Sequence, residues 1–393
     1  MQTVVLAAGE GTRMRPLTAR RPKPMLPVAD QPIVAHTLDA AVEAGADSLV
    51  VVVGYEGERI REYVGDTWQG VPVTYAEQPD QRGTADAVRV ASEKLTDDPF
   101  AVLNGDALYD TESLRAVFDS APAVGSFEVD DPTQYGVLQL DDASGTVAGI
   151  VEKPADPPSA FINTGAYAFP AAAREWLDVE ESQRGELELT DVLARVCEEY
   201  DVSPVRFDRW LDVGRPWELL EANEWKLGAL SRRVDGEVHE LAEIQGSVVV
   251  EEGATVRSGV VIEGPALIRS GATVGPNAYV RGATLVERGA NIGHSVEVKN
   301  SVVMEDVSVG HLSYVGDSLL GEGTNFGAGT TVANLRHDDG AIPTTVKGER
   351  VSTGRRKFGC VCGPDVKTGI NTSLNVGAVL GARETTEPGE VVR

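Results

Sequence analysis

The chain has 393 residues, a formal net charge of −26 and three cysteines. This length is enough for two domains with separate hydrophobic cores. The negative charge argues against nucleic acid and anionic membranes as partners, because both would repel an acidic protein. The odd, sparse set of cysteines and the shortness of the apolar runs predict a cytoplasmic protein without a membrane span.

The N-terminal stretch combines a short apolar strand, a glycine turn and several cations. Val4–Ala8 is apolar enough to be a buried strand, and Gly9 and Gly11 follow it directly. Glycines let backbone N–H groups approach an anion closely, and Arg13 and Lys23 add positive charge. This combination indicates a loop that binds the phosphates of a nucleoside triphosphate.

The spacing of this motif distinguishes it from two common phosphate-binding loops. Met14 stands where dinucleotide-binding loops have their third glycine, and no Gly-Lys-Ser/Thr follows as in the P-loop. The string Gly9-x-Gly11-Thr12-Arg13-x-x-Pro16-x-Thr18, followed by Pro22-Lys23-Pro24, instead resembles the signature of sugar-1-phosphate nucleotidylyltransferases. The resemblance implies that Arg13 and Lys23 are catalytic. The nucleotide-binding residues that it implies are Leu6, Ala8, Gly9, Gly11, Thr12, Gln78, Gly83 and Thr84.

Residues 1–230 alternate between strand and helix signals, which predicts a mostly parallel, Rossmann-like sheet in an α/β nucleotidyltransferase domain. The predicted strands are Val4–Ala8, Leu49–Val53, Val71–Ala76, Ala101–Leu103, Gly125–Val129, Tyr135–Leu140, Val147–Val151 and Ala166–Phe169. The predicted helices are Ile33–Ala44, Glu58–Val64, Thr84–Leu95, Ala171–Leu177, Thr190–Tyr200 and a linker from Pro216 to about Leu230. Ligands of such sheets bind outside the carboxyl ends of the strands.

Two aspartates lie at predicted strand ends: Asp106 directly follows Gly105, and Asp212 lies in the segment Trp210–Pro216, a strand end that runs into a turn at Gly214. Nucleotidyl transfer must screen the charge of the attacked phosphate, and carboxylates can hold a hard cation for this purpose. In the resembling family the aspartates of these motifs bind Mg²⁺, which implies a magnesium site here. The alternative is that both are ordinary turn-capping residues. The sugar-phosphate contacts that the resemblance implies in this domain are Gly136, Glu152, Lys153, Asn163 and Thr164.

Beyond residue 238, apolar residues recur every six positions, a period that neither a helix nor an alternating strand produces. The phase slips by one twice and resumes after each slip. The repeat comprises Ile244, Val250, Val256, Ile262, Ile268, Val274, Val280, Val286, Ile292, Val298, Val303, Val309, Val315, Leu320, Phe326, Val332, Cys362, Thr368, Leu374 and Leu380. One inward residue in six predicts the stacked coils of a β-solenoid. The pattern resembles the hexapeptide repeat of the left-handed β-helix, which implies a homotrimer and a second domain over residues 238–393.

The segment 334–358 breaks the six-residue period and is polar. We predict a loop or hairpin that leaves the solenoid beside a binding site, because long loops are often functional. The alternative is a plain surface insertion.

Within the repeat, the stretch Gly310–Asp317 with Asn325–Thr330 and Ala333-Asn334 resembles the acetyltransferase half of bifunctional enzymes that make UDP-N-acetylglucosamine. The resemblance implies that His311 removes a proton from the amine of glucosamine 1-phosphate, which attacks acetyl-CoA; imidazole suits this task near pH 7. The sugar-phosphate contacts that it implies are Arg281, Lys299, Tyr314, Asn325 and Asn334. Leu335, Gly340 and Pro343 depart from the bacterial pattern, whereas Ser352–Lys357 resembles the archaeal form.

We therefore predict a bifunctional enzyme that acetylates glucosamine 1-phosphate and transfers UMP from UTP to the product. One alternative is a single-activity glucose-1-phosphate uridylyl- or thymidylyltransferase with a structural β-helix, which the His311 motif disfavours. Another is a non-catalytic regulatory subunit that binds nucleotide sugars, which the intact phosphate and metal motifs disfavour. The sequence leaves open UTP or dTTP, and glucosamine, galactosamine or glucose 1-phosphate.

Overall fold

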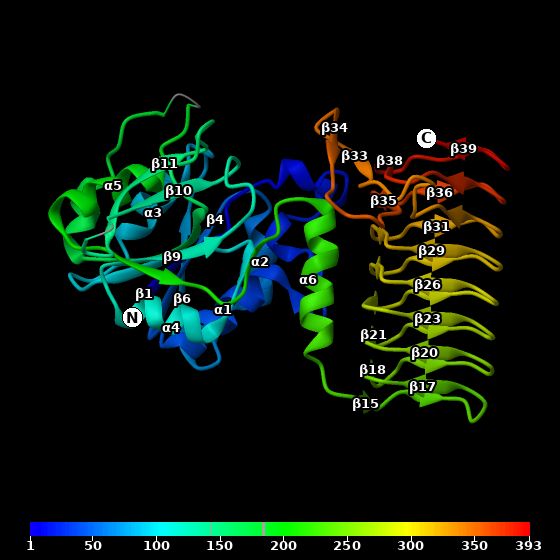
Figure 1. Cartoon of the computed structure of the whole chain (residues 1–393). Coiled ribbons are helices and arrows are strands. Elements are labelled where there is room, and N and C mark those ends of the chain that lie inside the picture. The colour runs from blue at the N-terminus through cyan, green and yellow to red at the C-terminus, as the bar shows by residue number, and fades with distance from the viewer. Residues whose placement is uncertain (142, 183–184) are drawn as a thin grey trace. The chain divides into compact units, whose positions relative to one another are not determined.

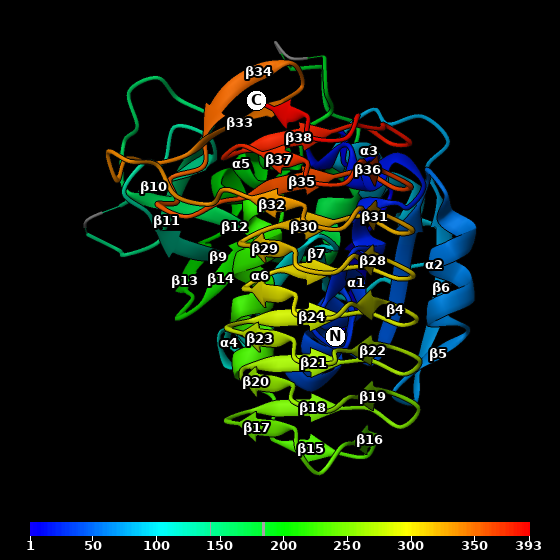
Figure 2. The ribbon, with the colours of Figure 1, turned by 90° about the vertical axis from the view of Figure 1, so that its right-hand side faces the viewer.

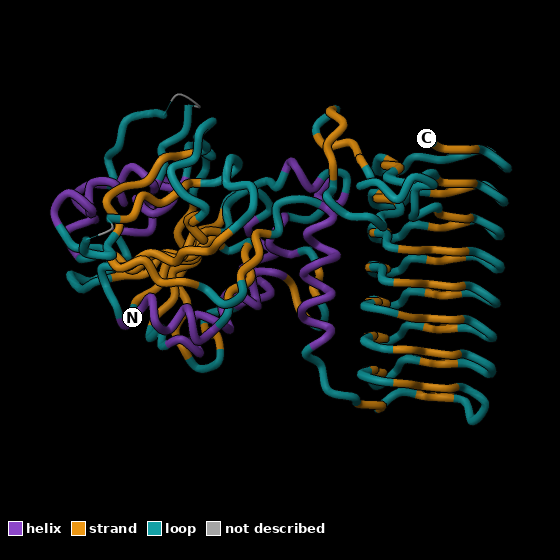
Figure 3. The backbone as a smooth tube through the Cα atoms, in the orientation of Figure 1, coloured by secondary structure: helices purple, strands orange, loops and turns teal. Residues whose placement is uncertain are grey.

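The computed structural model describes residues 1–141, 143–182 and 185–393, and the chain divides into two compact units. The first unit comprises Met1–Glu10, Pro22–Met25 and Pro32–Asp212; the second comprises Gly11–Arg21, Leu26–Gln31 and Val213–Arg393. Most helices lie in the first unit, whereas short strands dominate the second (Figure 3). Most of the glycine loop and the linker helix therefore pack with the C-terminal part of the chain.

The centre of the first unit is a mixed sheet whose middle strands are parallel. Its strands are β1 (Gln2–Leu6), β4 (Ser48–Val53), β5 (Thr67–Trp68), β6 (Val71–Glu77), β7 (Phe100–Asn104), β9 (Ala123–Glu128), β10 (Gly136–Leu140), β11 (Val147–Glu152), β12 (Phe161–Phe169) and β13 (Ser203–Arg206). The order is β11-β10-β12-β7-β1-β4-β6-β5, with β9 beside β12 and β13 beside β9. Strand β1 is parallel to β4 and β7, whereas β12 is antiparallel to β7. This arrangement confirms the predicted Rossmann-like sheet.

Helices cover both faces of this sheet. They are α1 (Ile33–Ala44), α2 (Gly57–Val64), α3 (Thr84–Ser92), α4 (Thr111–Asp119) and α5 (Leu189–Glu199). Alternate residues of a strand face opposite sides, so Val51 packs in one core with Leu38 of α1, and Val52 in another with Leu193 of α5. The segment predicted as a helix at Ala171–Leu177 is instead a 3-10 helix, η4 (Ala171–Trp176), a form typical of such short runs.

The second unit contains a β-helix with three parallel sheets (Figure 2). Its first sheet consists of β15 (Arg233–Val234), β18 (Val248–Val250), β21 (Ala266–Ile268), β24 (Thr284–Val286), β27 (Val302–Val303), β30 (Leu319–Leu320), β35 (Cys360–Cys362) and β38 (Ala378–Leu380). The second consists of β16 (Glu237–Val238), β19 (Thr255–Val256), β22 (Thr273–Val274), β25 (Asn291–Ile292), β28 (Ser308–Val309), β31 (Asn325–Phe326) and β36 (Lys367–Thr368). The third consists of β17 (Glu243–Gln245), β20 (Val261–Glu263), β23 (Tyr279–Arg281), β26 (Glu297–Lys299), β29 (Tyr314–Gly316), β32 (Thr331–Val332), β37 (Ser373–Leu374) and β39 (Val391–Val392).

The six-residue period corresponds to one continuous core inside these coils. Its predicted members from Val250 to Leu380 are buried, and Ile244 packs against them partly buried. The phase slips arise from shorter coils: Ile268 pairs with Val286, but Val286 pairs with Val303, one residue closer in sequence. The predicted left-handed β-helix is therefore confirmed.

Two further features complete the second unit. The interruption of the period contains the hairpin of β33 (Pro343–Val346) and β34 (Glu349–Ser352). The linker is helix α6 (Pro216–Gly228), which packs along β24 (Figure 1). Trp217 of this helix lies edge-on to Phe358. Among the described residues, no helix has the length and apolar character needed to cross a membrane.

Candidate active sites

The two predicted metal ligands lie together in the first unit, on either side of a buried lysine. Strand β14 (Trp210–Asp212) pairs with β8 (Ala107–Tyr109) so that Asp212 lies opposite Ala107, next to Asp106. Lys23 is only 4 % exposed, and its Nζ lies 2.6 Å from Asp106 Oδ2 and 3.8 Å from Asp212 Oδ1. Backbone pairing thus brings together two aspartates that are far apart in sequence.

The chemistry of this pair fits a small hard cation. The described residues contain no group of three or more histidine, cysteine, aspartate or glutamate side chains that could form a complete protein cage. Mg²⁺ is usually held by one or two carboxylates, with substrate phosphates and water as the other ligands. Asp106 and Asp212 provide that number of carboxylates.

The carboxyl ends of the central strands converge near the predicted nucleotide residues. Gly105 N donates to Leu6 O at 2.9 Å, which joins the ends of β7 and β1. A Cβ on Gly54 would lie 2.9 Å from Ala8 O and 3.0 Å from Gln78 O, so only glycine allows this approach. Leu6 ends β1, Ala8 lies two residues beyond it and Gln78 follows β6, so these three predicted residues lie at the edge of the sheet where ligands of such folds bind.

Gln78 and Gly83 stabilise the turn before helix α3. The Gln78 side chain is buried and donates to Gly83 O at 3.1 Å and to Asp86 Oδ2 at 2.9 Å. Burial raises the pKa of Asp86, but hydrogen bonds from Gln78 and Arg89 outweigh it and lower the pKa overall. Thr84 Oγ1 accepts from the N–H of Leu189 at the start of α5. These side chains fix the backbone around the predicted base-binding position.

The glycine loop forms compact turns within the second unit. Gly11 has φ +64° and precedes the 3-10 helix η1 (Thr12–Met14). Its carbonyl accepts from Met14 N at 2.9 Å and from Thr18 Oγ1 at 3.1 Å. Met14 is buried whereas Arg13 is exposed. The loop therefore presents the Arg13 side chain to solvent from a turn closed by its own hydrogen bonds.

The predicted sugar-phosphate residues of the first unit lie on β10, β11 and β12. Gly136 pairs with Glu152, and a Cβ at Gly136 would lie 2.9 Å from Glu152 Oε2. Lys153 follows with φ +46°, its Nζ 3.7 Å from Glu152 Oε1. The missing side chain of Gly136 thus gives the Glu152 carboxylate room across the strand.

The Asn163-Thr164 motif lies inside β12, where the pairing with β9 shifts register. Asn163 Oδ1 accepts from Gly165 N at 2.9 Å, and Asn163 Nδ2 donates to the buried Tyr167 hydroxyl. Burial raises the pKa of Tyr167. The Thr164 hydroxyl is fully buried against Gly125, without a hydrogen-bond partner among the described residues. Its side chain therefore faces the interior, and the predicted sugar contact would require its main chain.

A second polar cluster lies on the third sheet of the β-helix. Register stacks Arg281, Lys299 and Gly316 on successive coils. Lys299 Nζ lies 2.7 Å from Asp317 Oδ2, and Asn334 Nδ2 donates to the same oxygen at 2.5 Å and to Tyr314 OH at 3.1 Å. Three of the predicted sugar-phosphate residues, Lys299, Tyr314 and Asn334, thus share one cluster.

Asp317 is the residue of this cluster that sequence reasoning missed. Its side chain is only 3 % exposed, and it accepts hydrogen bonds from Lys299, Asn334 and Asn300. Its φ of +51° places it in a left-handed turn directly after Gly316. The sequence shows Asp317 only as an acidic residue inside the His311 motif. The motif does not indicate that this carboxylate is buried beside a lysine.

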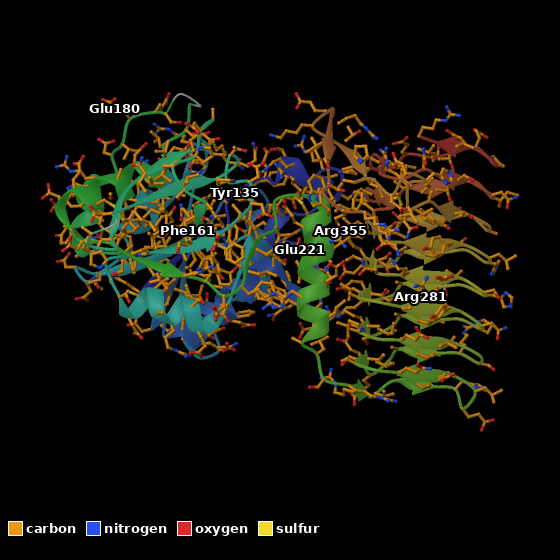
Figure 4. All side chains as sticks on the ribbon, in the orientation of Figure 1. Tyr135, Phe161, Glu180, Glu221, Arg281 and Arg355 are labelled. Atoms are coloured by element: carbon orange, nitrogen blue, oxygen red, sulfur yellow. The ribbon has the colours of Figure 1, made fainter. Side chains whose placement is uncertain are left out.

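Arg281 lies beside this cluster on the outer surface of the same sheet (Figure 4). Its guanidinium pairs with Glu297 at 2.7 Å, and its pKa is raised because hydrogen bonding and charge attraction to Glu297 outweigh burial. Burial raises the pKa of the Tyr314 hydroxyl. A Cβ on Gly316 would lie 2.5 Å from both Asn334 Nδ2 and Tyr314 OH, so glycine is needed for their contact.

His311 and Asn325 lie outside the Asp317 cluster. His311 is exposed in the turn between β28 and β29, and its carbonyl accepts from Gly329 N at 2.8 Å. Asn325 is exposed on β31 of the second sheet. The N–H of Leu312 donates to His294 O, which stacks the two histidines on successive coils. The structure therefore groups part of the predicted acetyltransferase site and leaves its histidine at a neighbouring corner.

These features define a class of protein: a nucleotidyltransferase sheet followed by a hexapeptide-repeat β-helix. The chain matches the Nucleotidyl transferase family over residues 2–227 and the GMPPB C-terminal domain over residues 262–390. It is 40 % identical to "Bifunctional protein GlmU" of Methanocaldococcus jannaschii, covering 97 % of this chain and 92 % of the relative. It is 37 % identical to a "Bifunctional sugar-1-phosphate nucleotidylyltransferase/acetyltransferase" of Sulfurisphaera tokodaii, covering 100 % and 97 %.

A solved structure resembles only part of the chain. It is a candidate glucose-1-phosphate thymidylyltransferase from Bacillus anthracis in complex with a sucrose, with 25 % identity and a TM-score of 0.53. The match covers 57 % of this chain and 94 % of that one. The chain belongs to the GlmU-type family of bifunctional sugar-1-phosphate nucleotidylyltransferase/acetyltransferases, because its curated relatives match along nearly its whole length.

Proposed function

We propose that this chain acetylates glucosamine 1-phosphate with acetyl-CoA and then transfers UMP from UTP to N-acetylglucosamine 1-phosphate. The products are UDP-N-acetylglucosamine and pyrophosphate. Residues 1–230 would form the nucleotidyltransferase domain with its linker helix, and residues 238–393 the acetyltransferase domain. The observation that carries this proposal is the grouping of motif residues in both halves, around Lys23 and around Lys299.

In the uridylyl transfer, Asp106 and Asp212 would hold Mg²⁺, which screens the charge of the triphosphate when bound. Arg13 and Lys23 would align the phosphates and balance the negative charge that accumulates as the sugar phosphate attacks and pyrophosphate leaves. Glu152 would accept hydrogen bonds from sugar hydroxyls, and Lys153 would pair with the sugar phosphate. The nearness of the two aspartates to Lys23 supports these roles.

In the acetyl transfer, His311 would take a proton from the ammonium of glucosamine 1-phosphate, so that the free amine attacks the thioester carbon. The C–N bond forms, the C–S bond breaks, and coenzyme A leaves as the thiol. Arg281 and Lys299 would bind the sugar phosphate, while Tyr314, Asn325 and Asn334 would hydrogen-bond the sugar. The cationic and polar character of the third sheet supports this assignment.

Two alternatives make different demands on the chain. A single-activity uridylyl- or thymidylyltransferase needs only the first half, which is the part that the Nucleotidyl transferase family matches, over residues 2–227. A regulatory subunit needs neither reaction. The bifunctional reading is favoured because the GlmU-type relatives match both halves.

We also propose that the protein is a homotrimer built through its β-helix and that it acts in the cytoplasm. His311 and Asn325 lie outside the Asp317 cluster of their own chain. In a trimer they would meet the remaining site residues of a second copy. The free thiols of Cys197, Cys360 and Cys362 suit a reducing compartment. Sedimentation of the full chain tests the trimer.

Two separate assays test the reactions. The first measures thiol release from acetyl-CoA with glucosamine, galactosamine or glucose 1-phosphate. The second measures pyrophosphate release from UTP or dTTP with the acetylated and unacetylated sugars, with and without Mg²⁺. We expect glucosamine 1-phosphate and UTP to be preferred. Pyrophosphate release without any thiol release would support the single-activity alternative, and neither activity would support the regulatory one.

A further inference from the structure

Three carboxylates follow one another along one corner of the β-helix. We call Glu305, Glu322 and Asp365 the acidic column. The pairing of Val303 with Leu320 places Glu305 beside Glu322 on the next coil, and Asp365 N donates to Glu322 O on the coil after that. Neighbouring strands are about 4.8 Å apart. Carboxylates stacked at this spacing repel one another unless a cation lies among them.

The cations come from the N-terminal glycine loop. One Arg21 nitrogen lies 2.8 Å from Glu305 Oε2 and 3.3 Å from Glu322 Oε2. Arg20 pairs with Asp365. The Arg21 side chain is only 15 % exposed, so its two contacts are less screened than those of an ordinary surface pair. Two consecutive arginines thus neutralise carboxylates on three successive coils.

The same loop carries the residues expected to bind the triphosphate. Arg20 and Arg21 end the segment Gly11–Arg21, which contains Arg13 and is closed by the Thr18–Gly11 hydrogen bond. A Cβ on Gly363 of the β-helix would lie 2.9 Å from Pro16 Cβ, so the loop packs closely on this coil. Lys23 follows Arg21 by two residues.

We propose that the acidic column of the β-helix positions the triphosphate loop, with Arg20 and Arg21 as its positioning residues. The inference rests on the proposed uridylyl transfer. A loop that is already held in one conformation loses less conformational entropy when the nucleotide binds, so binding is more favourable. The β-helix would therefore contribute to UTP affinity although it contains none of the predicted nucleotide-binding residues. Loss of the anchor should raise KM for UTP more than it lowers kcat.

The test uses Arg20→Gln and Arg21→Gln in the full chain. The matched control is Arg383→Gln, because Arg383 also approaches Asp365, at 4.0 Å, but belongs to the β-helix and is 76 % exposed. We expect each loop variant to raise KM for UTP about fivefold, to change kcat less than twofold and to leave thiol release unchanged; this size corresponds to losing a modest ion pair. The control should match the wild type.

Hydrogen exchange of the peptide covering residues 11–21, measured without nucleotide, provides a readout independent of turnover. We expect faster exchange in both loop variants and not in Arg383→Gln. The charge swap Arg20→Asp with Asp365→Arg should restore slow exchange if the pair itself anchors the loop. Wild-type exchange and wild-type KM in both loop variants would overturn the proposal. A wild-type chain without pyrophosphate release would instead refute the proposed uridylyl transfer, while the exchange result still decides whether the β-helix anchors the loop.

Discussion

The two regions of this molecule build their candidate sites by different means. In the first unit, Lys23, Asp106 and Asp212 come from separate elements, and the pairing of β8 with β14 brings the aspartates together. In the β-helix, Lys299 and Asp317 are one coil apart, and the repeat itself fixes their distance. The first site depends on tertiary assembly of distant segments, and the second depends on the register of a local repeat.

This difference has a consequence for mutations. A substitution in the first site removes a ligand or a cation at the meeting point of several elements, so its main effect should be on the reaction. A substitution in the β-helix cluster removes a partner from a buried network, so it should affect both reaction and local order. Variants in each region can therefore confirm or refute the distinction.

The largest expected effect comes from Asp106→Ala or Asp212→Ala. Each removes one of two carboxylates assigned to Mg²⁺, and loss of one main electrostatic stabiliser lowers turnover by roughly 10²-fold or more. Pyrophosphate release measures this effect, and thiol release should stay unchanged. Asp119→Ala, at the exposed end of α4, is the control. Near-normal turnover of Asp212→Ala at limiting Mg²⁺ would remove Asp212 from the metal site.

The corresponding prediction for the β-helix is His311→Ala. Loss of a general base should lower thiol release by about 10²-fold or more, without affecting pyrophosphate release from UTP and N-acetylglucosamine 1-phosphate. His294→Ala is a matched control, because it removes an imidazole from the adjacent coil. If His311→Ala acetylates normally, the β-helix is only a scaffold. If it loses both activities while remaining folded, the two sites are coupled.

Much of the fold was predictable because both regions have strong periodic signals. The helix Ile33–Ala44 was predicted with its observed bounds, since its apolar positions recur at helical spacing after Pro32. The six-residue repeat predicted the β-helix core because every coil must bury the same positions. The hairpin in 334–358 was recognisable because the repeat stops there.

The contacts of individual side chains were less predictable. From the sequence, Asp317 is only an acidic residue in a motif. The stacking of coils in the structure shows that its carboxylate accepts hydrogen bonds from three side chains. Arg20 and Arg21 have no predicted role in the phosphate-loop motif, yet they pair with carboxylates nearly 300 residues or more away in sequence. The burial of Thr164 follows from the shifted register of β12. Each of these depends on long-range packing, which a motif does not encode.

A smaller effect is expected for Asp317→Asn. The substitution keeps the size of the side chain but removes the negative charge beside Lys299 and turns one acceptor oxygen into an NH2 donor, so the donors from Lys299, Asn334 and Asn300 compete for one remaining oxygen. We expect KM for glucosamine 1-phosphate to rise about tenfold, while uridylyl transfer is unchanged. Asp306→Asn is the control, because Asp306 has a similar left-handed φ of +57° but an exposed side chain. Equal KM values for both variants would restrict Asp317 to a structural role.

The smallest expected effect is that of salt on thermal stability. With a net charge of −26 the folded chain repels itself, and ions screen that repulsion beyond about 10 Å at 0.1 M and at shorter range at higher concentrations. We expect Tm to rise by about 5 °C between 0.1 M and 2 M KCl, which corresponds to a gain of about 1–2 kcal/mol for domains of this size.

All five tryptophans lie between residues 68 and 225, so their fluorescence reports on the first unit and α6, whereas circular dichroism also reports on the β-helix. If in-register stacking makes the β-helix the more repulsive region, its transition should shift more with KCl than the fluorescence transition does. Equal shifts would show that charge repulsion is spread evenly, and a Tm that does not respond to KCl would exclude it as a determinant of stability.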